Sequence, residues 1–183
     1  MRRPVRPGVN RRALALARQV RILVLDVDGV LTDNRVWHDG PGSGFKSFGI
    51  QDGLGLKLLQ RADLEVAVIS GLGNAQAETR MRELGVEEFH GGHLHKLPVL
   101  ESLLSRKNLT FQQAAYMGDD WLDAPVMARV GLSMAPADAQ PEILRMASWV
   151  SRHPGGRGAV REAARFILQS QGRLSPLWRG WLA

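Results

Sequence analysis

The chain has 183 residues and a formal net charge of +6 at pH 7, and 44% of its residues are apolar while 23% are charged. This length and balance predict one globular domain and exclude collagen-like, coiled-coil and wholly disordered chains. The lack of cysteine excludes disulfides, thiolate metal sites and a cysteine nucleophile. No apolar run reaches the roughly 18 residues of a membrane-spanning helix, so no contact with a membrane is expected.

The positive charge is concentrated in residues 1–18, which hold six arginines and no acid. Residues 19–183 carry as many acidic residues as lysines and arginines. We therefore expect residues 1–18 to form a solvated basic tail. Nucleic-acid binding is the weaker alternative, because it would require a basic face on the folded domain itself. The arginines interrupt any apolar run of a secretory signal, so a cytoplasmic location is expected.

From residue 20 onward, short apolar runs alternate with stretches that have the spacing of helices. Strands are expected at 22–27, 65–70, 114–117, 131–134 and 149–151. Helices are expected at 53–61, 74–84, 97–107, 122–130 and 158–171. Continuous apolar strands suit a sheet that is covered on both faces. The alternation predicts an α/β fold with a doubly wound parallel sheet, in a domain of residues 19–172.

Residues 36–48 break this alternation and read VWHDGPGSGFKSF. Two short apolar stretches flank a glycine-rich centre, which predicts a β-hairpin directly after the first strand. Ligands of open α/β sheets bind beyond the carboxyl ends of the strands. The hairpin is therefore expected to overhang Asp26 and Asp28.

Acidic residues follow two of the apolar runs. Asp26 and Asp28 end the first, in DVDGVLTD, and the stretch GDDWLD at 118–123 follows a later one. Charge at the end of a buried strand is costly unless a metal or other partners compensate it. Carboxylates from two loops would form an oxygen cage suited to Mg²⁺. The plainer alternative is that each acid only caps a turn or a helix.

Two further polar residues fit the same site. Ser70 ends the second predicted strand before Gly71, where a hydroxyl and adjacent amides are able to hold an anion. Lys96 stands before a predicted helix. Alone, each has an ordinary alternative, as a turn serine and a solvated lysine. It is the order of the four features along the chain that points to one site.

These features resemble the four sequence motifs of the haloacid dehalogenase superfamily. DVDGVLTD resembles the first motif, Ser70 the second, Lys96 the third and GDDWLD the fourth. The resemblance is closer to the 3-deoxy-D-manno-octulosonate-8-phosphate phosphatases, a family without a cap domain. The stretches that carry it are FKSFGIQDGLG, AYMGDDWLDAPVMARVGLSMAPADAQP and GGRGAVRE. The similarity runs from about residue 22 to residue 172.

The resemblance implies a phosphomonoester hydrolase that acts on a phosphorylated sugar acid, 3-deoxy-D-manno-octulosonate 8-phosphate, in lipopolysaccharide biosynthesis. It implies that Asp26 is the nucleophile and forms an aspartyl-phosphate. Asp28 would protonate the leaving alkoxide and then activate water. Ser70 and Lys96 would hold the phosphoryl group.

The resemblance also implies the cofactor Mg²⁺. The side chains of Asp26 and Asp119 and the main-chain carbonyl of Asp28 would be its ligands. Asp120 or Asp123 would orient the lysine or the waters on the metal.

The sequence departs from the family pattern on the expected substrate side. Leu72 stands where an arginine is usual and Gln51 where a cation is frequent, and Gly91 and His95 also differ. These changes predict conserved phosphatase chemistry with an altered substrate preference. The candidate substrate-binding residues are Gly29, Gly71, Lys46, Arg80 and Arg157.

The resemblance implies a homotetramer in which a neighbouring subunit helps to close the active site. Residues 173–183 form a tail with two tryptophans, which either packs on its own core or reaches a partner. Two other functions stay open. One is a phosphatase for another nonulosonate or small phosphomonoester, and the other is a catalytically weak oligomeric module with a binding or regulatory role.

Overall fold

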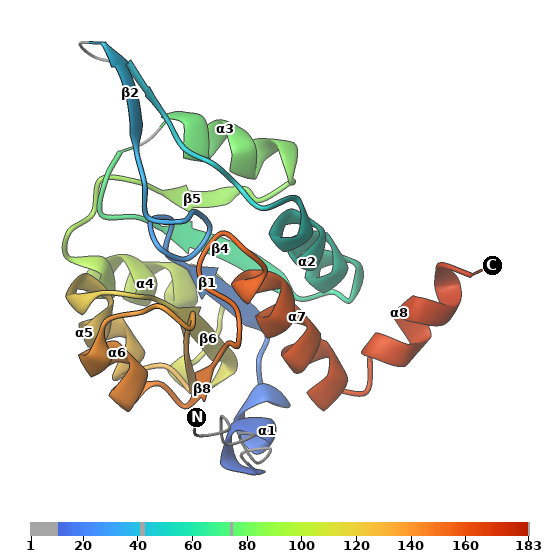
Figure 1. Ribbon diagram of the computed structural model, residues 1–183. Helices are drawn as coiled ribbons and strands as arrows, with labels where there is room; N and C mark the ends of the chain where they lie inside the picture. Colours follow the sequence, from blue (N-terminus) through green and yellow to red (C-terminus); the bar gives the residue numbers. More distant parts are fainter. Residues whose placement is uncertain (1–10, 41–42, 74, 183) are drawn as a thin grey trace, which may run out of the picture.

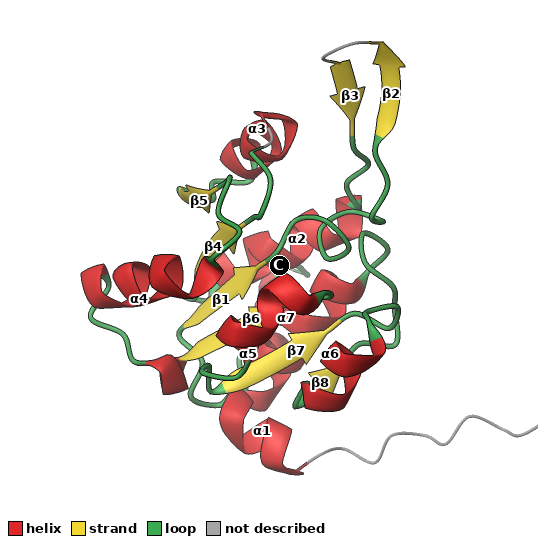
Figure 2. Ribbon diagram, turned by 90° about the vertical axis from the view of Figure 1, so that its left-hand side faces the viewer, coloured by secondary structure: helices red, strands yellow, loops and turns green. Residues whose placement is uncertain are grey.

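A parallel sheet forms the centre of the molecule, with helices on both of its faces (Figures 1 and 2). The computed structural model describes residues 11–40, 43–73 and 75–182. Within these residues the sheet has six strands, which confirms the predicted doubly wound α/β fold. Their order across the sheet is β5 (Glu88–His90), β4 (Glu65–Ile69), β1 (Ile22–Leu25), β6 (Ala114–Met117), β7 (Leu132–Ala135) and β8 (Trp149–Val150).

The central strands are buried along their whole length because helices cover both faces. Two apolar clusters result, one on each side of the sheet. The first face is covered by α1 (Arg11–Ala17), α2 (Ile50–Arg61), α3 (Ala75–Glu83) and α7 (Ala159–Ser170). The second is covered by α4 (Lys96–Arg106), α5 (Ala124–Met127) and α6 (Pro141–Met146).

The register of the strands brings the predicted site residues to one edge. Leu25 at the end of β1 lies opposite Val68 of β4 on one side and Met117 of β6 on the other. The residues after these three strands therefore leave the sheet at the same level. This is the edge where α/β sheets bind ligands.

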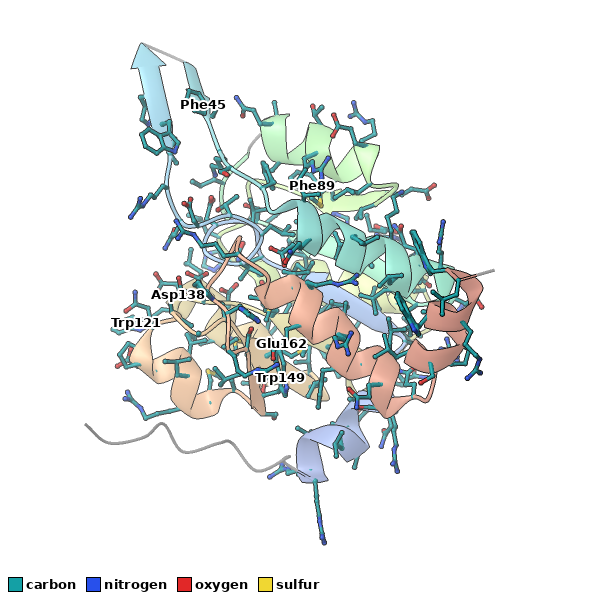
Figure 3. The ribbon with its side chains drawn as sticks, turned by 45° about the vertical axis from the view of Figure 1, so that its right-hand side comes forward. Phe45, Phe89, Trp121, Asp138, Trp149 and Glu162 are labelled. Carbon is teal, nitrogen blue, oxygen red and sulfur yellow. The ribbon has the colours of Figure 1, made fainter. Side chains whose placement is uncertain are left out.

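The predicted hairpin is present and projects from the body of the molecule (Figure 2). It consists of β2 (Trp37–Gly40) and β3 (Ser43–Phe45), which run antiparallel. The rings of Trp37 and Phe45 stack with centroids 6.4 Å apart, with Phe45 well outside the body (Figure 3). The described chain between β1 and β4 otherwise holds only α2, so it contains no cap domain.

Several boundaries differ from the expected ones. The predicted basic tail is wrong over residues 11–17, because these form α1 and bury Ala13 and Ala17 completely. Residues 1–10, 41–42, 74 and 183 lie outside the described residues. The helix expected at 122–130 is reduced to a 3₁₀ turn, Trp121–Asp123, followed by α5.

The C-terminal segment was expected to resemble a loop, but it forms α8 (Leu174–Gly180). Leu174 and Leu177 of this helix pack against the first apolar cluster. These two leucines place the start of α8 on its own core, and contact of the segment with a partner subunit stays a prediction. No helix among the described residues is long and apolar enough to cross a membrane.

Helix α7 begins on a carboxylate supplied by α2. Asp52 is buried, and its two oxygens accept the backbone N–H groups of Gly158 (3.0 Å) and Arg161 (2.8 Å). These are among the N–H groups that lack partners at the start of a helix, and a negative charge is favourable there. Asp52 therefore joins two helices more than 100 residues apart in the chain.

We expect Asp52→Ala to destabilise the fold by about 2–4 kcal/mol, because two buried donors lose their acceptor. Urea denaturation followed by circular dichroism measures this change. Asp52→Asn is the matched control and should cost less than half as much, since its amide oxygen still accepts one bond. A loss below about 0.5 kcal/mol for the alanine variant would contradict the assigned role.

Candidate active site

Asp26 is the first residue after β1 and lies in a buried group of acidic residues. It is 8% exposed, and its Oδ1 accepts the backbone N–H of Val27 at 2.7 Å. The ammonium of Lys96 lies 2.8 Å from the same oxygen. The carboxylate thus has a fixed orientation, with one oxygen held by the protein.

Lys96 is the first residue of α4 and is buried between two carboxylates. Its Nζ lies 2.7 Å from Asp123 Oδ1 as well as 2.8 Å from Asp26. Burial alone would lower the pKa of Lys96, but the charges of Asp123 and Asp26 outweigh it and raise the pKa. The lysine is therefore a permanent cation at the centre of the site.

Asp123 is fully buried and has a partner on every side. Its Oδ1 also accepts the hydroxyl of Tyr116 at 2.7 Å, and its Oδ2 accepts the backbone N–H groups of Asp119 (3.0 Å) and Asp120 (3.3 Å). A carboxylate engaged in this way holds other residues in place. Asp123, not Asp120, is thus the residue that orients the lysine.

Tyr116 is a site residue that the sequence interpretation did not include. Burial and the charge of Asp123 raise its pKa well above the ordinary value, so its hydroxyl stays protonated and donates to Asp123. Its position in an uninterrupted apolar strand conceals this role. In the sequence, the only feature that could have pointed to Tyr116 is its hydroxyl, in a strand that is otherwise fully apolar.

Asp119 has the features of a metal ligand. Its Oδ1 is buried and lacks a hydrogen-bond partner among the described residues. Ligand oxygens of Asp26, Asp119 and Asp123 all lie within 4.8 Å of one another. Burial, reinforced by the neighbouring carboxylates, raises the pKa of Asp26 to about 7 and that of Asp119 to about 8. Such crowded carboxylates with one unpartnered oxygen fit a hard divalent cation.

Gly29 allows Asp119 to approach the loop that follows β1. Its φ is +79°, and a Cβ atom there would lie 2.0 Å from Asp119 Oδ2. Gly155 supports the same loop from behind, since a Cβ atom at this position would lie 1.9 Å from the carbonyl oxygen of Gly29. The structure therefore shows a packing role for Gly29, which was predicted to bind substrate.

Ser70 lies at the same edge, one residue after β4. Its backbone N–H donates to His90 and its carbonyl accepts from His93, so its backbone is fixed. Its hydroxyl is buried and has no partner among the described residues. The hydroxyl is available to a bound anion, and its role in holding the phosphoryl group stays a prediction.

Asp28 lies on the other side of the loop and faces the hairpin. Its two carboxylate oxygens lie 2.6 and 2.8 Å from Lys46 Nζ. Lys46, the residue after β3, is buried, whereas Asp28 is partly open to solvent. Asp28 is thus close to the acidic group in sequence, but its side chain does not belong to that group.

A family model described as haloacid dehalogenase-like hydrolase matches residues 58–162, more than half of the chain. The 3-deoxy-D-manno-octulosonate 8-phosphate phosphatase of Escherichia coli (strain K12) is 40% identical over 166 residues, which cover 91% of this chain and 88% of the relative. The chain belongs to the haloacid dehalogenase superfamily, in the family of 3-deoxy-D-manno-octulosonate 8-phosphate phosphatases. It is therefore a phosphoric monoester hydrolase.

Solved structures of this family agree with the fold and the acidic site. The phosphatase from Yersinia pestis is 40% identical, with a TM-score of 0.88 over 90% of this chain and 89% of that one. A phosphatase from Moraxella catarrhalis was solved with magnesium ion, phosphate ion and a KDO molecule. It is 28% identical, with a TM-score of 0.91, and the match covers 95% of this chain and 99% of that one. Mg²⁺ is the cofactor that the carboxylates of this chain fit.

The candidate substrate residues of this phosphatase are spread over a wider area. Arg80 pairs with Glu83 at 3.0 Å, and its guanidinium lies beside Gly53 of α2, so the structure does not bring it into the acidic group. Arg157 is 64% exposed and lies 3.6 Å from Asp33, which follows the loop of Asp28. Arg157 is therefore at the rim of the site.

The rim beside Ser70 is apolar. Leu72 and Leu94 are more than half exposed, and Leu122 is nearly so. Leu94 and Leu122 lie on either side of Gly71, where a Cβ atom would touch both of them. The predicted substrate contact Gly71 is thus surrounded by apolar side chains.

The raised pKa values predict how pH affects the stability of the metal-free protein. The folded-state pKa values of Asp26 and Asp119 exceed the ordinary 3.8, so the folded protein holds protons that the unfolded chain has released. Its stability should therefore fall as pH rises from about 4 to about 8. Mg²⁺ competes with these protons, so its stabilising effect should grow across the same range.

Thermal unfolding with EDTA and with Mg²⁺, from pH 5 to pH 8, measures this effect. We expect the Mg²⁺-induced rise in Tm to increase by several degrees toward pH 8. Asp119→Asn is the control and should remove most of the dependence on Mg²⁺. A rise in Tm that is equal at every pH would contradict the prediction.

Proposed function

We propose that this phosphatase hydrolyses 3-deoxy-D-manno-octulosonate 8-phosphate through an aspartyl-phosphate formed on Asp26. The observation that carries the proposal is the buried group of Asp26, Lys96 and Asp119, in a chain 40% identical to enzymes named for that substrate. The proposed substrate is taken from the names of these relatives. The geometry supports the roles that we propose for the residues.

The first step transfers the phosphoryl group to Asp26. One oxygen of this carboxylate is held by Val27 and Lys96, which leaves the other to attack phosphorus. The new bond joins that oxygen to phosphorus, and the ester bond from phosphorus to the substrate oxygen breaks. Asp28 gives its proton to the departing alkoxide, so the alcohol leaves neutral.

The second step releases phosphate and restores the enzyme. Asp28, now a carboxylate, takes a proton from a water molecule that attacks the phosphorus. The bond from phosphorus to Asp26 then breaks, and inorganic phosphate leaves. Covalent catalysis in this way replaces one difficult displacement at phosphorus by two easier ones.

The surrounding residues stabilise the phosphoryl group during both steps. Lys96 presents a permanent positive charge, and Ser70 presents an unpartnered hydroxyl. When bound by Asp26, Asp119 and the main-chain carbonyl of Asp28, Mg²⁺ offsets the repulsion between a carboxylate and a phosphate dianion. Lys46 holds Asp28 at the base of the hairpin.

A second candidate substrate class is another nonulosonate or small phosphomonoester. The apolar rim of Leu72, Leu94 and Leu122 favours it, because these side chains provide no charge to bind the carboxylate of a sugar acid. Arg157 is the rim cation most able to fill that role, since it is largely exposed and its contact with Asp33 is long.

We expect kcat/KM for 3-deoxy-D-manno-octulosonate 8-phosphate to exceed that for other sugar phosphates and nucleotides by at least about tenfold. Steady-state assays with Mg²⁺ over a panel of phosphomonoesters measure this ratio. A higher kcat/KM for a phosphate that lacks the acid group would instead support the second candidate.

Asp26→Asn is the control for the chemistry. It should lower kcat at least about 1,000-fold while the protein remains folded. Unchanged turnover in this variant would contradict the mechanism. A wild-type protein that turns over no phosphate ester of the panel would support the binding or regulatory module.

We also propose that the protein is a cytoplasmic homotetramer assembled through its hairpins. Trp37 and Phe45 are each more than half exposed and stack on the projecting hairpin (Figure 3). Exposed apolar surface of this kind is typical of subunit contacts. The cytoplasmic location and the unlikely role in nucleic-acid binding stay predictions.

Light scattering after gel filtration tests the assembly. We expect a tetramer for the unmodified chain and a smaller species for the double variant Trp37→Ser with Phe45→Ser. Trp178→Ser is the control, because Trp178 is similarly exposed but lies on α8. A double variant that remains tetrameric would contradict assembly through the hairpins.

A further inference from the structure

A cavity of about 450 Å³ lies between α2, α7 and α8, and the described active-site residues do not line it. Figure 1 shows α8 beside these two helices, at the end of the chain. Most of its wall is apolar and includes Leu54 and Leu58 of α2 and Leu177 and Trp178 of α8. We call it the α8 cavity.

Two arginines of α7 form the polar part of this wall. Arg161 and Arg165 both line the cavity, one helical turn apart. The Nη1 atom of Arg161 is buried and has no partner, and neither guanidinium is paired with a carboxylate among the described residues. Burial and the charge of Arg165 lower the pKa of Arg161. Two like charges thus meet beside apolar surface.

The charge of Asp52 offsets part of the lowering of the Arg161 pKa, but no ion pair joins Asp52 to either arginine among the described residues. Asp52 uses its carboxylate oxygens for the backbone N–H groups of Gly158 and Arg161. The same contact fixes the backbone of Arg161. Gly55 adds to this, because a Cβ atom there would lie only 3.0 Å from the Cα of Arg161. The backbone of Arg161 is therefore held in position before any ligand arrives.

We propose that the α8 cavity binds a small amphipathic carboxylate with a single apolar chain. Its carboxylate would lie against Arg161 and Arg165, since guanidinium groups form paired hydrogen bonds with carboxylates. Its apolar part would lie against the leucines and Trp178. A neutral apolar molecule would leave the buried guanidinium unpaired, and a small inorganic anion would leave the apolar wall in water.

Decanoate is a suitable probe, and isothermal titration calorimetry on the full-length protein measures its binding. We expect saturable binding of about one decanoate per chain. Decyltrimethylammonium and acetate, which match the chain and the head group respectively, should each bind at least tenfold more weakly. Equal binding of the cationic and anionic probes would overturn the proposal, as would the lack of saturable decanoate binding.

Arginine variants test the position of the head group. Arg165→Met, at an exposed position, should weaken decanoate binding at least fivefold, and Arg161→Met at least tenfold, with folding checked by circular dichroism. Arg179→Met is the matched control, because this exposed arginine of α8 does not line the cavity. Unchanged affinity in both α7 variants would overturn the proposal.

Two further experiments separate this site from others. Decanoate binding should persist in Asp26→Asn and in the presence of inorganic phosphate, because it does not involve the active site. Loss of binding under either condition would overturn the assignment to α8. Sedimentation with phosphatidylglycerol vesicles that depends on the same arginines would assign the surface to a membrane and overturn it as well.

Discussion

The ion pairs of Lys96 with Asp26 and Asp123 join the first residue of α4 to the segments that follow β1 and β6. A buried ammonium is strongly unfavourable without partners, and a buried carboxylate likewise. Each of these groups therefore depends on the others for its place in the structure. The segments that carry Asp26 and Asp123 converge because β1 and β6 are in register, so the loops that follow them leave the sheet at one level.

One lysine does not balance the negative charge of this site. Asp123 is saturated by Lys96, Tyr116 and two backbone N–H groups, so it holds the arrangement together. Burial is the main cause of the raised pKa values of Asp26 and Asp119, and repulsion by the neighbouring carboxylates adds to it. A divalent cation relieves that repulsion, and the same charge then favours a phosphate dianion. The electrostatic strain of the metal-free site is thus the basis of its affinity.

The residues that the sequence identified are those that end buried strands. Asp26, Ser70 and Asp119 could be predicted because a polar side chain after an apolar run stands at the sheet edge. Tyr116 could not, because β6 is buried on both faces and shows no alternation to indicate its direction. The position of Arg80 outside the acidic group could not be predicted for a related reason. Helical spacing shows which residues share a face, but the facing partner, here Gly53 of α2, depends on tertiary packing.

Composition also concealed two helices. Residues 1–18 hold six arginines, yet Ala13 and Ala17 are four residues apart and bury one face of α1. At the other end of the chain, α8 has only Leu174 and Leu177 to hold it against the core. In both helices a narrow apolar stripe is enough for docking, because the rest of the surface is already formed by α7 and its neighbours. A short helix of this kind has little stability alone, so it takes its structure from the surface it covers.

The segments that distinguish this family from the wider superfamily support the catalytic loop from outside the sheet. The stretch FKSFGIQDGLG contains Lys46, which pairs with Asp28. It also contains Asp52, which accepts a backbone N–H at the start of α7. GGRGAVRE supplies Gly155, which packs against the carbonyl of Gly29, and Gly158, which Asp52 binds. The loop between Asp26 and Thr32 is therefore held between the hairpin and α7. These contacts fix the position of the loop that carries Asp28, in a chain whose described residues contain no cap domain.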